Sequence, residues 1–323
     1  MYINKLNEFM LKNLPKLSVN ILTFKTNKNI LKRCINSIDK SIPINIIENS
    51  KNFEHSKYFK KIRKNVKIYC TGENCGYAKG HNYGFSKTSS RYVLICNPDV
   101  IFKKNYFKYL FNYLGNKLIF DILGSQYEKK EMYKPAYGLF DKKEINPKLK
   151  KDKFGLQRVN WVVGCTMLFD LKRFKTNKIF DENYFMFYEE TDLCKRVISK
   201  NGIIYSGSKL IINHLGEKSS FAVIPKHKID YIKLRNWHLM WSSFYFSKKH
   251  FGFFHSFIIH FYSLIKNFIK FFIFLFFFQK EKSTKHLYRY LGLLNSMLGN
   301  KSLFRVQIIK RRFHRLLQKF ARW

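Results

Sequence analysis

Five carboxylates stand together in residues 181–196, DENYFMFYEETDLCKR, around a run of aromatic side chains. They are Asp181, Glu182, Glu189, Glu190 and Asp192. A carboxylate beside apolar rings can act as a general base, because burial adjusts its affinity for a proton. It can also bind a divalent cation. The structural alternative is an acidic helix start, where the helix dipole favours negative charge, followed by a core helix.

Polar residues that could bind a ligand also follow apolar runs earlier in the chain. Glu48 and Asn49 follow one run, and Asn97 and Asp99 follow another. Between them lies the glycine-rich segment ENCGYAKGHNYGF, at 73–85. Glycine lets a backbone approach a ligand closely, although this spacing matches neither a P-loop nor a dinucleotide-binding loop.

Alternating apolar strands and amphipathic segments must position these residues. Short apolar runs predict strands over 17–25, 42–50, 65–70, 91–100, 118–127 and 159–170, with two further short strands within 203–216. Strand–helix alternation favours an α/β fold with a mostly parallel sheet, helices on both faces and ligands at the carboxyl ends of the strands. The polar residues expected at those ends are Thr23, Glu48, Asn49, Asn74, Asn97 and Asp99.

The charge of the chain is strongly basic and unevenly spread. Lys and Arg number 61 against 21 Asp and Glu, giving a formal net charge of +40. Part of this excess reflects a general enrichment in Lys, Asn, Ile and Phe. After Glu217 only Asp230 and Glu281 are acidic. Carboxylate chemistry is therefore expected in the first two thirds, and an anionic binding partner for the last third.

The cysteines and residues 1–16 indicate which cellular compartment to expect. None of the six cysteines forms a CxxC pair, so zinc ribbons and thioredoxin-like motifs are not expected. Residues 1–16 are mixed in character and do not resemble a secretory leader. Reduced thiols in a cytoplasmic protein are the simplest expectation.

The last hundred residues suggest contact with a membrane. Residues 253–278 are apolar and long enough to span a bilayer. Lys266 and Lys270 interrupt the run, and each would cost roughly 3 kcal/mol near a bilayer centre, so an in-plane helix or a shallow hairpin is at least as well supported as a span. Residues 303–322 carry one apolar and one basic stripe, typical of a helix on an anionic membrane. The alternative is a core helix with a solvated basic face.

Five segments in order resemble one protein family. They are IIENSKN, ENCGYAKGHNYGF, LICNPDV, FDENYFMFYEETDLCKR and NHLGEKSS. Together they resemble the rhamnosyltransferase and galactofuranosyltransferase branch of the family 2 glycosyltransferases, which are inverting enzymes of GT-A fold using nucleotide-activated sugars. The resemblance spans about 17–221 and implies a GT-A catalytic domain over 1–220, with a basic, aromatic-rich helical region for membrane association over 221–323.

The resemblance implies a donor site at the strand ends. Glu48 and Asn49 stand where the family has an Asp-Asn pair that contacts the nucleoside, although a strand-end turn would use the same residue types. The remaining residues expected to bind nucleotide or sugar are Thr23, Asn74, Gly76, Gly80, Asn82 and Asn97. Asp99 takes the place of the metal-binding carboxylate for Mn²⁺ or Mg²⁺, and His214 resembles a late histidine that completes the metal site or is merely structural.

The acidic segment resembles the family's catalytic motif. Glu190 stands where the family has its general base, with Glu189 beside it, and either could act. Asp192 is expected to bind backbone or basic neighbours, and together with Trp161 it is also a candidate acceptor contact; a core Trp is the commoner outcome. Asp181 and Glu182 are expected to shape the loop. The surrounding aromatic residues would exclude water.

These observations favour one function over two alternatives. The resemblance implies an inverting transfer of a rhamnose- or galactofuranose-like sugar, or another hexose, from a nucleotide-diphosphate donor to a lipid-linked or surface-polysaccharide acceptor. The expected location is the cytoplasmic face of a bacterial inner membrane, bound peripherally or inserted shallowly. A basic nucleic-acid-binding protein is one alternative, although no recognisable nucleic-acid-binding motif accompanies the charge. A family member inactivated by its Glu-for-Asp changes is the other.

Overall fold

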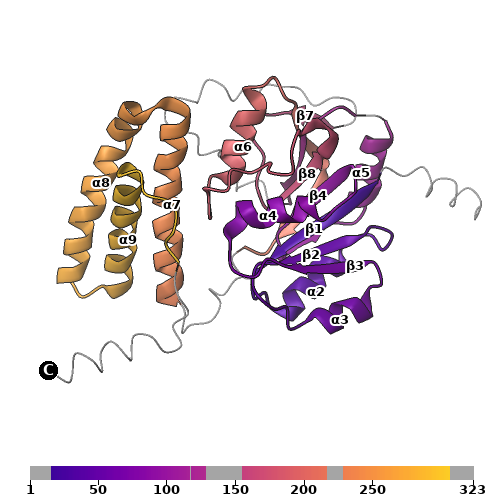
Figure 1. Cartoon of the computed structure of the whole chain (residues 1–323), viewed down its shortest axis with the longest axis horizontal. Coiled ribbons are helices and arrows are strands. Elements are labelled where there is room, and N and C mark those ends of the chain that lie inside the picture. The colour runs from indigo at the N-terminus through magenta and orange to yellow at the C-terminus, as the bar shows by residue number, and fades with distance from the viewer. Residues whose placement is uncertain (1–15, 117, 129–154, 217–227, 306–323) are drawn as a thin grey trace, which may run out of the picture.

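The computed structural model describes residues 16–116, 118–128, 155–216 and 228–305, which form a sheet domain and a helical bundle beside it (Figure 1). Nine strands in the described ranges make one sheet, in the order β3-β2-β1-β4-β8-β6-β9-β5, with β7 paired to β9. Their bounds are β1 (Leu17–Thr23), β2 (Ile44–Glu48), β3 (Val66–Cys70), β4 (Tyr92–Cys96), β5 (Val100–Phe102), β6 (Ile122–Tyr127), β7 (Leu156–Arg158), β8 (Thr166–Asp170) and β9 (Ile204–His214).

Helices cover both faces of this sheet, as expected. The helices of the sheet domain are α2 (Lys28–Asn36), α3 (Ser56–Ile62), α4 (Gly76–Ser86), α5 (Tyr106–Gly115) and α6 (Glu189–Ile198). One core joins α2, α3 and α5 to the sheet and contains Leu31, Phe59 and Leu110. The second core joins α4 and α6 to the opposite face and contains Phe85 and Leu193. The alternation of side chains along each strand supplies both cores.

The direction of the strands departs from the sequence-based expectation of a mostly parallel sheet. β3, β2, β1 and β4 are parallel, and β6 is parallel to β9, but the pairings β4–β8, β6–β8, β5–β9 and β7–β9 are antiparallel. The two short strands expected within 203–216 are one strand, β9, whose register against β6 shifts between Gly124 and Gln126. An apolar run has no direction of its own, so the sequence pattern could not distinguish these cases.

Two glycines let α4 lie close against the parallel strands. A Cβ at Gly80 would stand 2.6 Å from Leu22 Cδ1 of β1, and one at Gly84 would stand 3.1 Å from Asn20 Nδ2 and Ile47 Cγ1. Carbon atoms do not normally approach this closely, so a methyl group at Gly80 would push the helix off the sheet. The spacing of these glycines therefore serves helix packing.

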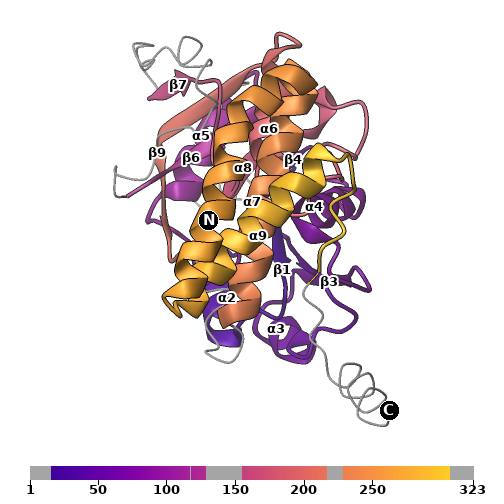
Figure 2. The ribbon, with the colours of Figure 1, turned by 90° about the vertical axis from the view of Figure 1, so that its left-hand side faces the viewer.

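Three long helices form the bundle. They are α7 (Lys228–Phe251), α8 (Phe253–Phe276) and α9 (Lys280–Met297). Figure 1 places α7 next to the sheet domain and α8 on the far side of the bundle, and Figure 2 shows the bundle face on. The backbone of Trp237 in α7 leaves no room for a side chain at Gly292 of α9. The sheet ends at His214 and the bundle begins at Lys228, on either side of the domain boundary predicted near residue 220.

The packing of Gly80 leads to a stability prediction. Gly80→Ala should lower the free energy of unfolding by about 1–3 kcal/mol, because the new methyl group overlaps Leu22. Gly115→Ala is the matched control in α5, where a Cβ meets nothing within 4 Å, and it should be neutral or slightly stabilising. Urea unfolding followed by circular dichroism measures both. Equal effects of the two substitutions would contradict the packing role of Gly80.

Candidate active site

The carboxyl ends of β1 and β2 are joined through Glu48. Its side chain is 1% exposed. It accepts hydrogen bonds from Thr23 Oγ1 and Ser50 Oγ, both at 2.7 Å, and from the Lys25 backbone N–H at 3.2 Å. These bonds hold the turn after β1, where Lys25 has a φ of 49° and Phe24 is half-exposed. Glu48 and Thr23 therefore support the turn at which the nucleoside site is expected.

Asn49 organises the loop that leads into α4. Its Nδ2 donates to Asn74 Oδ1 at 3.1 Å and to the Gly76 carbonyl at 3.0 Å. Its Oδ1 accepts from Thr71 Oγ1 at 3.0 Å and from the Cys75 backbone N–H at 3.1 Å. With its amide fully engaged and 3% exposed, Asn49 shapes the site, while Asn74 lines the cavity described below.

Gly76, Gly80 and Asn82 are buried within the protein, and their expected contacts with nucleotide or sugar stay predictions. A Cβ at Gly76 would stand 2.5 Å from the Phe185 carbonyl oxygen. Asn82 donates from Nδ2 to the Phe180 carbonyl at 2.9 Å and accepts from the Phe180 N–H at 2.9 Å. Gly76 and Asn82 thus join α4 to residues 180–185, whereas Gly80 packs against Leu22 of β1.

A carboxylate and an imidazole meet beyond the end of β4. Asp99 Oδ1 lies 3.2 Å from His214 Nε2, and Asp99 is 1% exposed. The cause is the antiparallel pairing of β5 with β9, whose register sets Val100 opposite His214. Tyr127 Oη lies 3.3 Å from His214 Nδ1 and orients the ring. Asn97 is half-exposed at the same strand end.

The Asp99–His214 pair fits a divalent cation. Asp99 Oδ1 is buried, and apart from the contact with His214 Nε2 it has no polar partner within the described residues, so a cation bound there would offset the cost of its burial. No cluster of three or more His, Cys, Asp or Glu side chains suited to a metal occurs in the described part of the chain. A cation held here would take its other ligands from donor phosphates and water, as Mg²⁺ usually does.

The acidic pair Glu189–Glu190 begins α6 after a strained turn. Phe187 and Tyr188 have φ values of 70° and 67°, a left-handed conformation that costs non-glycine residues about 1–2 kcal/mol each. The turn is held by a 2.8 Å hydrogen bond from the Tyr77 N–H to the Phe185 carbonyl and by one of 2.9 Å from Ser242 Oγ to the Met186 carbonyl. Strain held by surrounding contacts is common at catalytic sites.

The two glutamates differ in exposure. Glu189 is 6% exposed, and its Oε2 is buried without a hydrogen bond among the described residues. Burial, and next the charge of Glu190, raise the pKa of Glu189 well above its usual value. Glu190 is half-buried; burial also raises its pKa, and backbone N–H groups at the helix start offset part of the rise. Glu190 is thus the better placed of the two to exchange a proton with a ligand.

The Cys165 thiol is close enough to both Asp99 and Glu190 to be affected by their charges. Burial raises the pKa of its thiol to about 12, and the charges of both carboxylates add to the rise. The same two charges act on the Tyr127 hydroxyl, which lies 3.2 Å from Cys165 Sγ. The predicted metal ligand and the predicted base therefore both lie near Cys165 and Tyr127. Glu190 also packs against Gly164, where an added Cβ would stand 3.3 Å from Glu190 Cβ.

Asp192 is structural, which corrects its candidate role in binding the acceptor. The side chain is fully buried. It pairs with Arg196 and Lys249 at 2.7 Å and with His250 at 2.9 Å, in agreement with the expectation of basic partners. Asp181 also pairs with Lys249, at 2.7 Å. Both acids therefore connect the end of α7 to the sheet domain through ion pairs.

Trp161 and Glu182 lie at the edges of the site. Trp161 is half-buried, and its Nε1 donates to Thr191 Oγ1 of α6 at 3.1 Å. A role in stacking on the acceptor stays a prediction. Glu182 is exposed and accepts a hydrogen bond from Asn82 Nδ2 at 3.1 Å.

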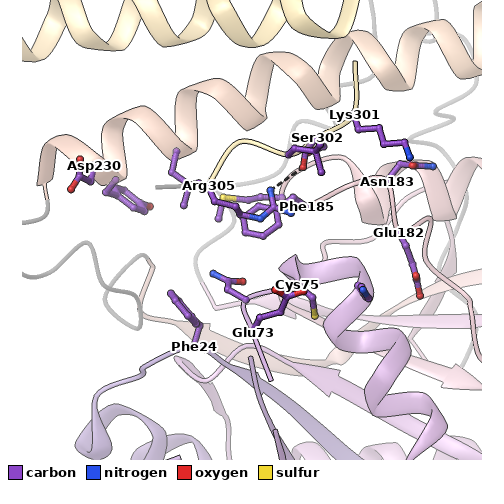
Figure 3. Close-up of a pocket in the computed structure, with 16 residues that line it drawn as sticks. Phe24, Glu73, Cys75, Glu182, Asn183, Phe185, Asp230, Lys301, Ser302 and Arg305 are labelled. Atoms are coloured by element: carbon purple, nitrogen blue, oxygen red, sulfur yellow. Dashed lines mark hydrogen bonds between the residues drawn. The ribbon is translucent and has the colours of Figure 1, made fainter. Parts of the chain in front are cut away.

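A cavity of about 640 Å³ opens between the sheet domain and the bundle (Figure 3). One wall comes from the strand ends and the loop before α4, with Phe24, Glu73 and Cys75. The opposite wall comes from the acidic segment and the chain after α9, where Arg305 lies 3.6 Å above the ring of Phe185. Of the predicted site residues only Asn74 lines this cavity; the Asp99–His214 pair and Glu190 do not.

Several residues of the site were not identified from the sequence. Ser242 and His238 of α7 support the catalytic segment, since His238 stacks on Phe185 with ring centroids 4.6 Å apart. Tyr77 donates a hydrogen bond to the Gly164 carbonyl. Tyr127 orients His214. Nothing in the local sequence around α7 indicated this role, because the contacts join segments far apart in the chain.

The fold and site together define a class. The parallel order β3-β2-β1-β4, an acid–imidazole pair beyond the end of β4 and carboxylates at the start of α6 fit the GT-A fold. The sequence profile of Glycosyl transferase family 2 matches residues 18–175, so this part of the chain is similar to that family.

Known proteins similar to this chain agree with the class. The low-salt glycan biosynthesis hexosyltransferase Agl10 of Haloferax volcanii is 23% identical over 198 residues, covering 58% of this chain. The match spans 63% of that relative, less than two thirds of its length.

Two solved structures share the fold. GalNAc-T7, solved with UDP, GalNAc and Mn²⁺, has a TM-score of 0.52 at 14% identity, over 74% of this chain and 52% of that chain. The mannosyltransferase PcManGT from Pyrobaculum calidifontis, solved with GDP-Man and Mn²⁺, has a TM-score of 0.50 at 8% identity, over 90% and 89%. At these identities the likeness shows the fold alone.

The ion pairs of Asp192 predict how stability depends on pH. Burial alone would raise the pKa of Asp192, but His250, Arg196 and Lys249 hold it at about 2. This stabilisation is complete above the unfolded value near 3.9 and is lost as the pH falls through about 2. Asp192→Asn should therefore cost about 3 kcal/mol at neutral pH and flatten the decline between about pH 4 and 2.

Asp230→Asn is the control for this experiment, because Asp230 is 37% exposed and pairs with Lys233 at 3.5 Å. Its loss should cost less than about 1 kcal/mol. Urea unfolding across the pH range measures both variants. An unchanged acid decline in Asp192→Asn would show that its ion pairs do not contribute.

Proposed function

We propose that this protein is a metal-assisted, inverting glycosyltransferase that moves a sugar from a nucleotide-diphosphate donor to a lipid-linked or surface-glycan hydroxyl. The observation that carries the proposal is the pair Asp99–His214 at the end of β4. The match to the profile of Glycosyl transferase family 2 and the folds of two proteins solved with nucleotide or nucleotide sugar and Mn²⁺ support it.

The strand ends would hold the donor. The nucleoside fits over the turn built by Thr23 and Glu48, beside half-exposed Phe24 and Asn74. The diphosphate then extends toward Asn97 and Asp99. Asp99 and His214 would hold Mn²⁺ or Mg²⁺, which would supply positive charge to stabilise the leaving diphosphate.

Glu190 would accept the proton from the acceptor hydroxyl. As that proton passes to a carboxylate oxygen, the hydroxyl oxygen forms a bond to the anomeric carbon, and the bond from this carbon to the diphosphate oxygen breaks. Attack opposite the leaving group inverts the anomeric configuration. Buried aromatic residues before α6, such as Tyr184 and Phe185, keep water from competing as the acceptor.

The proposal also includes a class of sugar and a kind of acceptor. A rhamnose- or galactofuranose-like sugar follows from the resemblance of the motifs, and the relative from Haloferax volcanii is named a hexosyltransferase in glycan biosynthesis. The bundle at 228–305 and the adjoining tail would keep the enzyme at the cytoplasmic face of a bacterial inner membrane, near a lipid-linked acceptor. The stripes predicted over 303–322 lie mainly outside the described residues.

Donor binding gives a direct test. Among UDP-, dTDP-, GDP- and CMP-sugars, one nucleotide class should raise the melting temperature only with Mn²⁺, by the equivalent of about 2.7 kcal/mol at one hundred times its Kd. Asp99→Asn should lose this rise, because it weakens the metal site, while the exposed Asp39→Asn keeps it. No shift with any donor, together with salt-sensitive binding to nucleic acid, would favour the nucleic-acid alternative.

Substitution of the proposed base Glu190 should separate donor binding from sugar transfer. Glu190→Gln should lower kcat by about 10²- to 10⁴-fold while keeping the donor-induced thermal shift. Glu189→Gln should lower it less, since Glu189 is more deeply buried. Because burial raises the pKa of Glu190, activity should fall as the pH drops through a value above that of an ordinary glutamate. Activity is measured as transfer of the sugar to acceptors in a membrane lipid extract. Full activity of Glu190→Gln would show that another residue is the base.

A further inference from the structure

Helix α8 has its polar side facing the protein and its apolar side facing outward. Its fully buried residues are polar: Ser256, His260 and Asn267. Their separations of four and seven place them on one side of the helix. A surface helix of a water-soluble protein has the opposite arrangement, with apolar residues against the core and polar residues in water.

Hydrogen bonds to the neighbouring helices hold this polar side in place. His260 Nε2 lies 3.0 Å from Ser243 Oγ of α7, and Asn267 Oδ1 lies 2.9 Å from His286 Nδ1 of α9. Burial lowers the pKa of His260, so the ring is neutral at physiological pH. The polar groups of α8 are thus satisfied inside the bundle and fix which face points outward.

The outward side is a continuous apolar surface along the whole helix. The residues at 254, 258, 261, 265, 269, 272 and 276 alternate by three and four, which makes one stripe about 35 Å long. Phe254 is 82% exposed, Ile258 74% and Phe276 76%. The most apolar window of α8, the one candidate membrane span in the described residues, is only 11% buried, so α8 is not a core helix.

The same bundle carries a cluster of cations between α7 and α9. A groove of about 410 Å³ there is lined by Arg235, Lys282, Lys285 and Arg289, together with Glu281. Lys270 of α8 is close enough to act on Lys285, whose pKa is lowered chiefly by the charge of Arg289. Crowded like charges repel one another, and an anion in the groove would relieve that repulsion.

We propose that the outer face of α8 inserts into an anionic bilayer with its axis in the membrane plane, while the cations of the α7–α9 groove contact lipid phosphates. This inference deepens the membrane association included in the proposed function, and it does not depend on the donor or the sugar. It identifies the docking surface and its orientation.

The in-plane orientation follows from the packing of the bundle. α8 is joined to α7 and α9 through its polar side, so a span by α8 would carry its neighbours into the hydrocarbon. The beginning of α9 contains Lys280, Glu281 and Lys282, and Lys285 and Arg289 follow one and two turns later. Inserting these charges is far more costly than laying one apolar face at the interface.

Charge also favours a lipid surface over a second copy of the chain. Two copies joined through α8 would bring their cation clusters near each other, whereas an anionic bilayer neutralises them. A dimer formed through this face is therefore the outcome that would contradict the proposal.

Vesicle flotation with the full chain tests the surface. The vesicles are phosphatidylcholine alone or mixed with phosphatidylglycerol. Ile258→Asp/Ile269→Asp should reduce the fraction bound to mixed vesicles at least about tenfold, because two carboxylates now face the hydrocarbon. Ile62→Asp/Ile119→Asp is the matched control, with the same charge change at exposed isoleucines of the sheet domain, and should bind like wild type.

The groove is tested in the same assay. Lys282→Gln/Lys285→Gln should reduce binding to phosphatidylglycerol vesicles several-fold and weaken its salt dependence, since each basic residue near the surface contributes about 1 kcal/mol. Lys57→Gln/Lys60→Gln, an exposed pair in α3 with the same spacing, should have no effect. Equal binding to neutral and anionic vesicles in wild type would overturn the role of the groove.

Spin labels distinguish an in-plane helix from a span. Single cysteines at 254, 265 and 276, in protein whose Cys70 and Cys75 are replaced by Ser, should report one similar, shallow depth. A span would place 265 far deeper than 254 and 276. Either that result, or a dimer in solution without vesicle binding, would refute the proposal.

Donor binding separates this proposal from the proposed function. Ile258→Asp/Ile269→Asp should keep the Mn²⁺-dependent thermal shift of wild type in detergent, because these side chains contact no part of the donor site. Wild type that binds vesicles but no donor would refute the proposed function and leave the docking surface standing. Wild type that binds a donor but no vesicles would refute only the docking surface.

Discussion

The antiparallel pairing of β5 with the end of β9 is the contact on which the site depends. It sets Val100 opposite His214, and through this register it brings a late imidazole to within 3.2 Å of Asp99. Neither residue alone would make a metal site, since a single carboxylate or imidazole binds a hard cation weakly. A cation held by the pair, as proposed, would take its other ligands from the donor diphosphate and water.

The acidic segment contains both candidate catalytic carboxylates and architectural ones. Glu189 and Glu190 begin α6, whereas Asp181 and Asp192 form ion pairs with Lys249 of α7. The two groups are coupled, because the ion pairs hold the same loop whose residues Phe187 and Tyr188 are in a left-handed conformation. A strained turn persists only when its surroundings hold it, and here α7 is part of those surroundings.

The bundle is joined to the candidate site as well as to the proposed docking face. α7 contacts the acidic segment through Ser242 and His238, and it binds α8 through Ser243. One helix thus joins the site to the proposed docking face. The large positive charge of the chain also fits the proposed contact with an anionic surface.

The sequence by itself determined the features that depend on neighbouring residues. Apolar runs located most of the strands but not β5 or β7, and the polar residues Thr23, Glu48, Asn97 and Asp99 lie at strand ends, where an α/β sheet places them. The tertiary structure decided strand direction, the meeting of Asp99 with His214, and the packing roles of Gly80 and Asn82. It also decided the orientation of α8, whose polar side faces the bundle. The polar residues of α8 can be read from the sequence, but their hydrogen-bond partners cannot. These features depend on contacts between segments far apart in the chain, and local periodicity carries no information about which segments meet.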